Sequence, residues 1–306
     1  MTSRTDALRL GTRRSLLATA QSQMVADDYT AATGATIELV GVTTFGDVTK
    51  AALAQLGGTG VFVTGLRDKL IEGEIDFAVH SLKDLPTKQD ERFTLAALPT
   101  RHDHRDALVG PHKFADLPTG AKVGTGSPRR IAMLRAIRPD LRYVPIRGNA
   151  DTRIGKVTSG ELDAVVLASA GLARIGRSAE IAQIFEIEEL LPAPGQGCLA
   201  VECLSARADL VDFLGVLDDP RSRSAVAAER AVLAALEAGC SAPVGAFAVD
   251  DGHTLNLTAE VVALDGTQAV RKSAAGSPSE AVTLGRRLAA EMIAEGADRL
   301  MGEHSH

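Results

Sequence analysis

Twice along the 306-residue chain, a short apolar segment typical of a strand ends in a polar turn with arginine and serine, and a helix pattern follows. The first case begins at residues 8–11 and the second at 121–125. After each helix come another strand, a loop, a second helix and a third strand that ends in a polar turn. Strands that alternate with helices form parallel sheets, so the repeated order predicts two α/β lobes that face a cleft, each with a parallel core.

The third strand pattern of the first lobe, 75–79, runs into the polar turn Ser81-Leu82-Lys83-Asp84. Ligands of open α/β sheets bind beyond the carboxyl ends of strands, which makes Lys83 and Asp84 candidates for work on a small charged substrate. The alternative is a surface salt bridge at a strand end. Taken alone, this stretch favours the salt bridge.

Length and pattern together predict three domains. Their boundaries are 7–100 with 197–216 for the first lobe, 105–192 for the second lobe, and 220–302 for a small C-terminal α+β domain. The Pro- and Gly-rich segment 191–197 indicates a crossover or hinge, after which 199–201 returns to the first lobe as a strand. Asp251-Gly252 and Asp265-Gly266 are hairpin signals, so we expect a three-stranded antiparallel sheet in the C-terminal domain, closed by a helix over 279–300.

Composition excludes several classes of partner. The net charge of −6 argues against binding to nucleic acid or acidic membranes, and 3% aromatic residues without Trp argue against stacking on single strands. No run approaches the ~18 apolar residues of a membrane helix, and the amino terminus lacks the apolar core of a signal peptide. We therefore expect a cytoplasmic protein. Without an obvious apolar surface stripe, we expect a monomer.

Six arginines fall in turns or first helical turns of the two lobes. They are Arg13, Arg129, Arg130, Arg147, Arg153 and Arg174. Ser127 as N-cap and Pro128 at the first helical position place two of them where a helix dipole favours anions. Guanidinium groups hold carboxylates bidentately, so the set predicts a cleft for a substrate with several carboxylates. A single such arginine is more often a solvated surface residue, and phosphate is the competing anion, although no Walker motif is present.

Among the three cysteines, Cys240 is the candidate for chemistry. It lies on a loop just beyond a helix, whereas Cys203 has the mid-strand position of a structural cysteine and Cys198 is the weaker thiol candidate. The carboxyl end of a helix does not favour a thiolate, so a reactive Cys240 needs an activating neighbour or a very reactive electrophile. His102-Asp103-His104 favours a solvated loop over a metal site, and we expect no metal.

Six stretches of the chain resemble the porphobilinogen deaminase (hydroxymethylbilane synthase) family, in family order and at family spacing. They are Leu10–Arg13, Ala78–Pro86, Val123–Arg130, Arg147–Asn149, Leu191–Gly197 and Glu237–Pro243. The resemblance implies two lobes like those of type II periplasmic binding proteins and a third domain that carries a cysteine. It implies a transferase of tetrapyrrole (haem) biosynthesis, which joins four porphobilinogen molecules head to tail into hydroxymethylbilane and releases ammonia. The implied cofactor is dipyrromethane, a covalently attached primer.

The resemblance also assigns roles to single residues. Cys240 matches the cysteine that carries the primer, and Asp84, with Lys83 beside it, matches the aspartate that handles protons and stabilises cationic pyrrole intermediates. The implied primer contacts are Ser81, Lys83, Asp84, Thr125, Ser127, Arg129, Arg130, Arg147, Gly148, Ala170 and Gly171. The implied substrate contacts are Arg13, Ser15, Arg147, Arg153, Arg174 and Gln196. Loss of ammonia from porphobilinogen leaves an azafulvene, an electrophile that could capture a modestly activated thiol.

Four positions depart from the family pattern. Phe45 replaces an arginine, Gln55 and Thr59 stand where many members carry lysines, and Gly126 replaces a serine. These changes put in doubt which residues of the first lobe contact the growing chain. Two alternatives stay open, a cytoplasmic two-lobed binding protein for a polycarboxylate and a phosphate-handling transferase. Only the deaminase would release ammonia and a linear tetrapyrrole from porphobilinogen.

Overall fold

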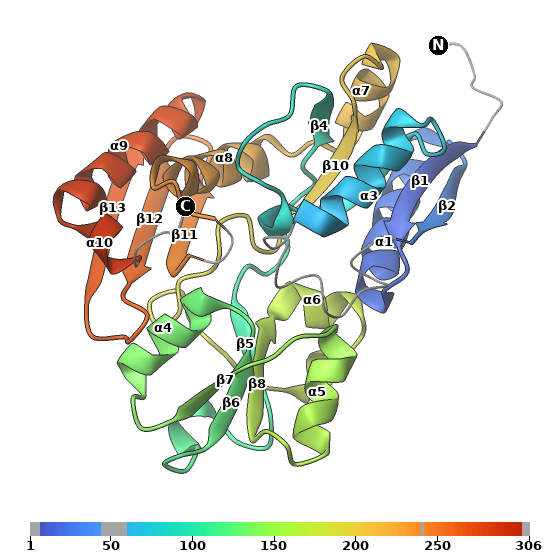
Figure 1. Cartoon of the computed structure of the whole chain (residues 1–306). Coiled ribbons are helices and arrows are strands. Elements are labelled where there is room, and N and C mark those ends of the chain that lie inside the picture. The colour runs from blue at the N-terminus through green and yellow to red at the C-terminus, as the bar shows by residue number, and fades with distance from the viewer. Residues whose placement is uncertain (1–6, 44–59, 240–241, 302–306) are drawn as a thin grey trace. The chain divides into compact units, whose positions relative to one another are not determined.

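The computed structural model describes residues 7–43, 60–239 and 242–301, and the chain divides into two compact units (Figure 1). Unit 1 comprises Met1–Arg101 and Cys198–Arg223, and unit 2 comprises His102–Gly197 and Ser224–His306. Within unit 2, we call His102–Gly197 the second lobe and the part from Ser224 onward the C-terminal domain. The chain therefore enters unit 2 after Arg101 and returns to unit 1 at Cys198.

Unit 1 contains a five-stranded sheet of order β2-β1-β3-β10-β4. Its strands are β1 (Leu8–Arg13), β2 (Ile37–Val42), β3 (Phe77–Ser81), β4 (Phe93–Ala97) and β10 (Leu199–Leu204). Its helices are α1 (Leu16–Thr33), α3 (Gly60–Ile71), α7 (Ala208–Leu214) and the 3₁₀ helices η2 (Leu82–Asp84) and η5 (Gly215–Leu217). Strand β1 is parallel to β2 and β3, whereas β10 is antiparallel to both β3 and β4.

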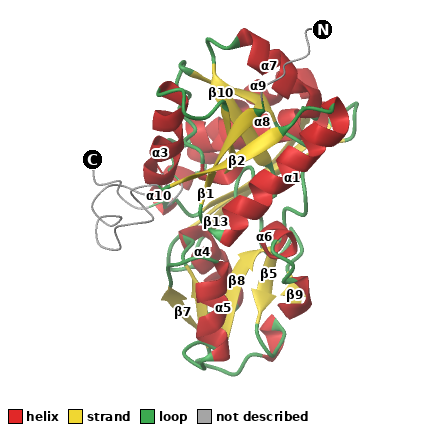
Figure 2. Cartoon of the chain, turned by 90° about the vertical axis from the view of Figure 1, so that its right-hand side faces the viewer, coloured by secondary structure: helices red, strands yellow, loops and turns green. Residues whose placement is uncertain are grey.

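The two faces of this sheet are covered by different helices. Phe77 and Val79 pack with residues of α1 and α7, whereas Ala78, between them, packs with Leu66 and Leu70 of α3. Because successive side chains of a strand point to opposite faces, α1 and α3 lie on opposite sides of the sheet, as Figure 2 shows.

The second lobe repeats this plan with a sheet of order β7-β6-β8-β5-β9. Its strands are β5 (Asp106–Val109), β6 (Lys122–Thr125), β7 (Arg142–Pro145), β8 (Ala164–Ala168) and β9 (Ile181–Ile184). Its helices are α4 (Pro128–Ile137), α5 (Ala150–Thr158), α6 (Ser169–Arg174) and the 3₁₀ helices η3 (Phe114–Asp116) and η4 (Ser178–Glu180). Strand β6 is parallel to β7 and β8, whereas β5 is antiparallel to both β8 and β9, so the two sheets have the same architecture.

The C-terminal domain has an antiparallel sheet of order β11-β12-β13 against helices. Its elements are β11 (Val244–Asp250), β12 (Leu255–Val262), β13 (Ala269–Gly276), η6 (Pro278–Glu280), α9 (Ala281–Ala294) and α10 (Ala297–Leu300), preceded by α8 (Pro220–Ala235). It packs closely on the second lobe: Phe247 and Val262 belong to the same apolar core as Met133 and Leu191. At Gly245 an added Cβ would lie 2.8 Å from the Leu191 carbonyl oxygen, so only glycine allows this approach.

Most of the predicted architecture is confirmed. Each lobe has its parallel core, 199–204 returns to the sheet of unit 1, and the C-terminal domain has its three antiparallel strands. Strands β4, β5 and β9 were not predicted. The last helix is not continuous over 279–300, because Gly296 adopts a left-handed conformation (φ 88°) and separates α9 from α10.

Candidate functional site

The predicted site residues follow the carboxyl ends of corresponding parallel strands in the two units. After β1 and β6 come the N-caps of α1 and α4, Ser15 and Ser127. After β3 comes η2 with Lys83 and Asp84, and after β8 comes α6 with Ala170 and Gly171. Carboxyl ends of parallel strands are the usual ligand positions of α/β sheets, so both units have their candidate residues where a ligand site is expected.

In unit 1, Asp84 is exposed on the turn that follows β3. Lys83 beside it is half-buried, and the hydroxyl of Ser81 accepts a hydrogen bond from Gln21 Nε2 at 3.0 Å. Arg13 is half-buried at the end of β1. The turn thus presents a carboxylate to solvent from a backbone fixed by the sheet, and the predicted strand-end position of Asp84 is confirmed.

A buried polar triad lies directly before this turn. His80 Nε2 is 3.1 Å from Glu202 Oε2, and Arg67 Nη2 on α3 donates to Glu202 Oε1 at 2.6 Å. Burial would raise the pKa of Glu202, but the hydrogen bonds from His80 and Arg67 outweigh it and hold the pKa below its usual value. His80 is therefore a residue at a strand end whose ring nitrogen already has a partner inside the protein.

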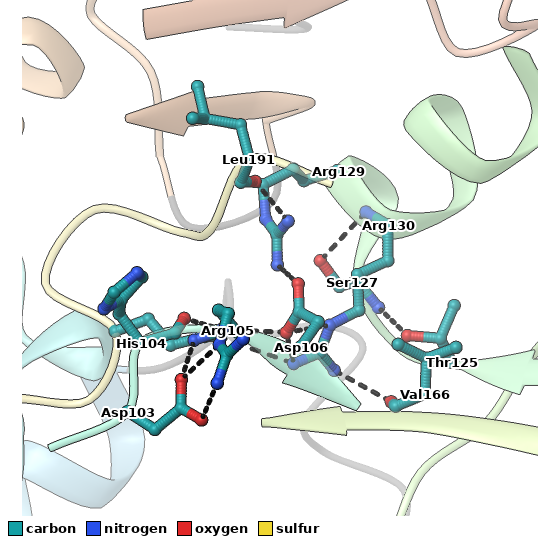
Figure 3. Close-up of polar contacts among 11 residues, drawn as sticks. Asp103, His104, Arg105, Asp106, Thr125, Ser127, Arg129, Arg130, Val166 and Leu191 are labelled. Carbon is teal, nitrogen blue, oxygen red and sulfur yellow. Dashed lines mark hydrogen bonds and ion pairs between the residues drawn. The ribbon is translucent and has the colours of Figure 1, made fainter. Parts of the chain in front are cut away.

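In unit 2, Arg129 and Arg130 share one carboxylate, that of Asp106 at the start of β5 (Figure 3). Arg129 Nη2 donates to Asp106 Oδ2 at 2.6 Å and Nη1 donates to the Leu191 carbonyl at 2.5 Å. Arg130 donates to Asp106 Oδ1 from Nη2 at 2.6 Å and from Nε at 3.0 Å, and to the Val166 carbonyl from Nη1 at 2.9 Å.

This cluster is almost completely removed from water. Asp106 is 0% exposed, Arg129 2% and Arg130 5%. Burial would raise the pKa of Asp106, but the charges and hydrogen bonds of the two arginines outweigh it and leave the pKa far below its usual value. Burial also lowers the pKa of Arg129, against the pull of Asp106. Asp106 was not among the predicted site residues.

The other predicted contacts of unit 2 have varied surroundings. Arg147 is exposed in the loop after β7, and Arg153 Nε on α5 donates to the Gly148 carbonyl at 2.8 Å. Arg174 Nη2 donates to the Gly197 carbonyl at 2.8 Å. Thr125 is buried at the end of β6, where its hydroxyl accepts from Ser127 N at 3.3 Å. Arg13 is the last residue of β1 and Arg174 the last residue of α6, so these two do not lie in turns or first helical turns as predicted.

Gln196 belongs to the Asp106 cluster. Its side chain is 1% exposed, and Nε2 lies 2.8 Å from both Asp106 Oδ1 and the His104 carbonyl. The segment that carries it is thereby joined to the chain entering the second lobe.

Gly126, one of the departures from the family pattern, has a steric role. A Cβ at this position would lie 2.7 Å from the Ile146 carbonyl oxygen, because the segment after β7 passes close to the turn between β6 and α4. That segment continues into Arg147 and Asn149, the N-cap of α5. Gly126 therefore permits an approach that brings a predicted ligand arginine beside this turn.

Some predictions fall outside the described residues, namely those for Cys240, Phe45, Gln55 and Thr59. Within the described ranges, no helix is long and apolar enough to cross a membrane. In the same ranges, no group of three His, Cys, Asp or Glu residues is arranged to hold a metal ion. Cys203 is buried inside β10, and burial raises the pKa of its thiol to about 11, as fits a structural cysteine.

Sequence reasoning missed Asp106 and Glu202. Both had a local signal: a lone carboxylate beside or inside an apolar run, in Asp106-Ala107-Leu108-Val109 and in Ala200-Val201-Glu202-Cys203. A carboxylate in such a run must find a cationic partner when it is buried. The signal does not say which partner.

Comparisons with known proteins cover nearly the whole chain. Residues 8–212 match the family model "Porphobilinogen deaminase, dipyromethane cofactor binding domain", and residues 224–294 match "Porphobilinogen deaminase, C-terminal domain". The porphobilinogen deaminase of Thermobifida fusca is 57% identical over 98% of this chain and 97% of its own length. Porphobilinogen deaminase 1 of Streptomyces coelicolor is 56% identical over 98% of each chain.

Likeness to solved structures is more remote. The methionine-binding protein MetQ has a TM-score of 0.45 and 11% identity, over 68% of this chain and 88% of that chain. Immunogenic lipoprotein A from Vibrio vulnificus has a TM-score of 0.45 and 11% identity, over 71% and 97%. Both are too distant to inform function.

Proposed function

Because the chain belongs to the porphobilinogen deaminase family, we propose that it joins four porphobilinogen molecules head to tail into hydroxymethylbilane and releases ammonia. The observation that carries the proposal is the exposed carboxylate of Asp84 on a turn at the carboxyl end of β3. A pyrrole substrate with acidic side chains needs such a carboxylate for its nitrogen and cations for its side chains.

Asp84 would act in two ways. Positive charge develops on the pyrrole nitrogen of porphobilinogen when its amino group leaves, and a fixed carboxylate close by favours that charge. The same carboxylate can accept the proton that is lost when the next pyrrole is joined. Lys83, adjacent on η2, would contact acidic side chains of the substrate.

We propose that the primer is dipyrromethane, attached through Cys240, and that the residues of unit 2 suit its acidic side chains. Arg129 Nε is buried and has no hydrogen-bond partner among the described residues, and the Asp106 cluster has two cations for one anion. Guanidinium groups match carboxylates in shape and charge. When bound, the primer supplies the pyrrole carbon to which the first new unit is joined.

The remaining predicted contacts are part of the proposal. The primer would be held by Ser81, Lys83, Asp84, Thr125, Ser127, Arg129, Arg130, Arg147, Gly148, Ala170 and Gly171. The substrate would be held by Arg13, Ser15, Arg147, Arg153, Arg174 and Gln196. We further propose a cytoplasmic monomer with domain boundaries at 7–100 with 197–216, 105–192 and 220–302.

Two measurements test the proposal. Incubation with porphobilinogen should release ammonia and give a linear tetrapyrrole, and Asp84→Asn should abolish turnover while the circular dichroism spectrum stays unchanged. Intact-mass spectrometry should find the wild-type chain heavier than its sequence by two linked pyrrole units, and Cys240→Ser without that addition. Full turnover by Asp84→Asn would refute the role of the carboxylate. Ligand binding without ammonia release would favour a binding protein for polycarboxylates.

A further inference from the structure

The cluster around Asp106 differs from the other arginine–aspartate pairs of the second lobe in its charge balance. Arg138 pairs with Asp140 at the end of α4, one cation to one anion on the surface. Asp106 faces two guanidinium groups, both buried. Glu260 also acts electrostatically on Arg129, but Arg271 lies 3.5 Å from Glu260 and pairs with it. The two arginines therefore keep a surplus of positive charge in a place where water cannot screen it.

Arg129 and Arg130 differ in how many of their guanidinium donors have a partner in the protein. Arg130 commits Nε and Nη2 to Asp106 and Nη1 to the Val166 carbonyl, so the protein itself occupies its fork. Arg129 uses only Nη2 for Asp106 and Nη1 for the Leu191 carbonyl. Its Nε is buried and has no partner among the described residues. A buried unpartnered donor beside surplus positive charge favours an anion, and Arg129 is the better placed of the two to receive it.

Asp106 itself is held firmly enough to fix this arrangement. It is the first residue of β5 and lies opposite Ala168 of β8, and its carbonyl accepts from Phe185 N at 2.9 Å. Gln196 Nε2 donates a further hydrogen bond to Oδ1 at 2.8 Å. The carboxylate is thus fixed by the backbone of a central strand and by a third donor from the segment that leads out of the second lobe.

We propose that Asp106 is a positioning residue, which holds Arg130 as a support and orients Arg129 to receive one carboxylate of the substrate or primer. This inference rests on the proposed function, because the anion is an acidic side chain of a pyrrole. Asp106 does not contact the reacting atoms. Its effect is transmitted through the two guanidinium groups that it separates and aligns.

A positioning role of Asp106 and a role in charge balance alone predict different ligand binding by Asp106 variants. If Asp106 only offset positive charge, Asp106→Asn would strengthen binding of an acidic substrate, and Asp106→Glu would behave as wild type. If Asp106 positions the arginines, both variants weaken binding. Asn replaces one of the two acceptor oxygens with an NH2 donor, so one of the two arginines loses its acceptor. Glu keeps the charge but displaces it by one methylene, which a close-packed interior does not absorb.

The experiment compares wild type, Asp106→Asn, Asp106→Glu and the control Asp140→Asn, which breaks a bidentate pair at the other end of α4. We expect KM for porphobilinogen to rise about tenfold in both Asp106 variants, which is the loss of one charge-assisted hydrogen bond, with a smaller change in kcat. Intact-mass spectrometry should find a reduced fraction of primer-loaded chains in both, and wild-type values in the control.

The outcomes separate the two levels of inference. A lower KM in Asp106→Asn with wild-type KM and loading in Asp106→Glu overturns the positioning role. Circular dichroism checks that each variant folds. If only Asp106→Glu folds, its KM and its primer loading alone decide whether Asp106 positions the arginines. If neither variant folds, Asp106 is a structural residue and the positioning role is refuted. Absence of ammonia release by wild type would instead refute the proposed function.

Discussion

Replacement of Gly126 by alanine tests the close approach between two turns of the second lobe. The added Cβ would lie 2.7 Å from the Ile146 carbonyl oxygen, which is backbone and cannot rotate away. The carbonyl would have to recede by roughly 0.7 Å to reach ordinary contact. Ile146 N donates to the Thr125 carbonyl at 3.2 Å, so the same displacement strains the hydrogen bond that joins the segments.

The expected cost follows from overpacking of this kind, which destabilises by about 1–3 kcal/mol. We expect the free energy of unfolding in urea to fall by about 2 kcal/mol in Gly126→Ala. KM for porphobilinogen should rise several-fold, because Arg147 lies on the displaced segment, whereas kcat should change less, because Asp84 belongs to the other sheet. Hydrogen exchange measured on peptides from 142–158 should locate the loosening.

Gly155→Ala is the matched control. Gly155 is an exposed residue of α5, and an added Cβ there meets no atom within 4 Å. Alanine should leave KM unchanged and stabilise the chain by up to about 1 kcal/mol, because it favours the helical conformation. Equal stability and equal KM for the two variants would show that the Ile146 carbonyl accommodates a side chain, and the steric role of Gly126 would be refuted.

Three further predictions concern the stability of unit 1. Glu202→Gln leaves Arg67 without its counter-charge and should lower the free energy of unfolding by about 3 kcal/mol. Asp76→Asn, at a more exposed pair with Arg9, should lower it by about 1 kcal/mol or less. Equal losses for the two variants in urea denaturation would contradict this difference. The pKa of Glu202 is lowered by folding, so its contribution is complete above its ordinary pKa of 4.5 and is lost as pH falls through the lower folded pKa. The difference in urea midpoint between wild type and Glu202→Gln should therefore narrow below about pH 4.5, and a constant difference would disprove the linkage. Tyr29→Phe removes the buried hydrogen bond to the Leu214 carbonyl and should cost about 1–2 kcal/mol, measured in the same way; an unchanged midpoint would argue against that bond.

The elements that could be predicted are those with a local cause. The parallel strands are apolar runs separated by helices, and the start of α4 was predicted from Ser127 and Pro128 because capping depends on neighbours in sequence. The exposed turn at Asp84 follows from an apolar run that becomes polar. Strands β5 and β9 have four residues each and are antiparallel additions, so their existence depends on partners far along the chain.

The interior of the site could not be predicted for the same reason. The sequence places Arg129 and Arg130 at a helix start, where a ligand anion is one possible partner. Their described partner, Asp106, precedes them by more than twenty residues, and Gln196 joins the same carboxylate from ninety residues away. Nothing in the local pattern distinguishes an arginine that will receive a ligand from one that is held by a distant acid.

The place of β10 has a consequence for synthesis on the ribosome. This strand lies between β3 and β4, yet it is translated only after the whole second lobe. A nascent chain that has emerged as far as residue 197 therefore exposes the unpaired edges of β3 and β4, which invite association with other chains. The strands of the second lobe, by contrast, are contiguous in sequence and can form their complete sheet as soon as they have emerged. The second lobe is therefore translated after most of unit 1 but can complete its sheet first.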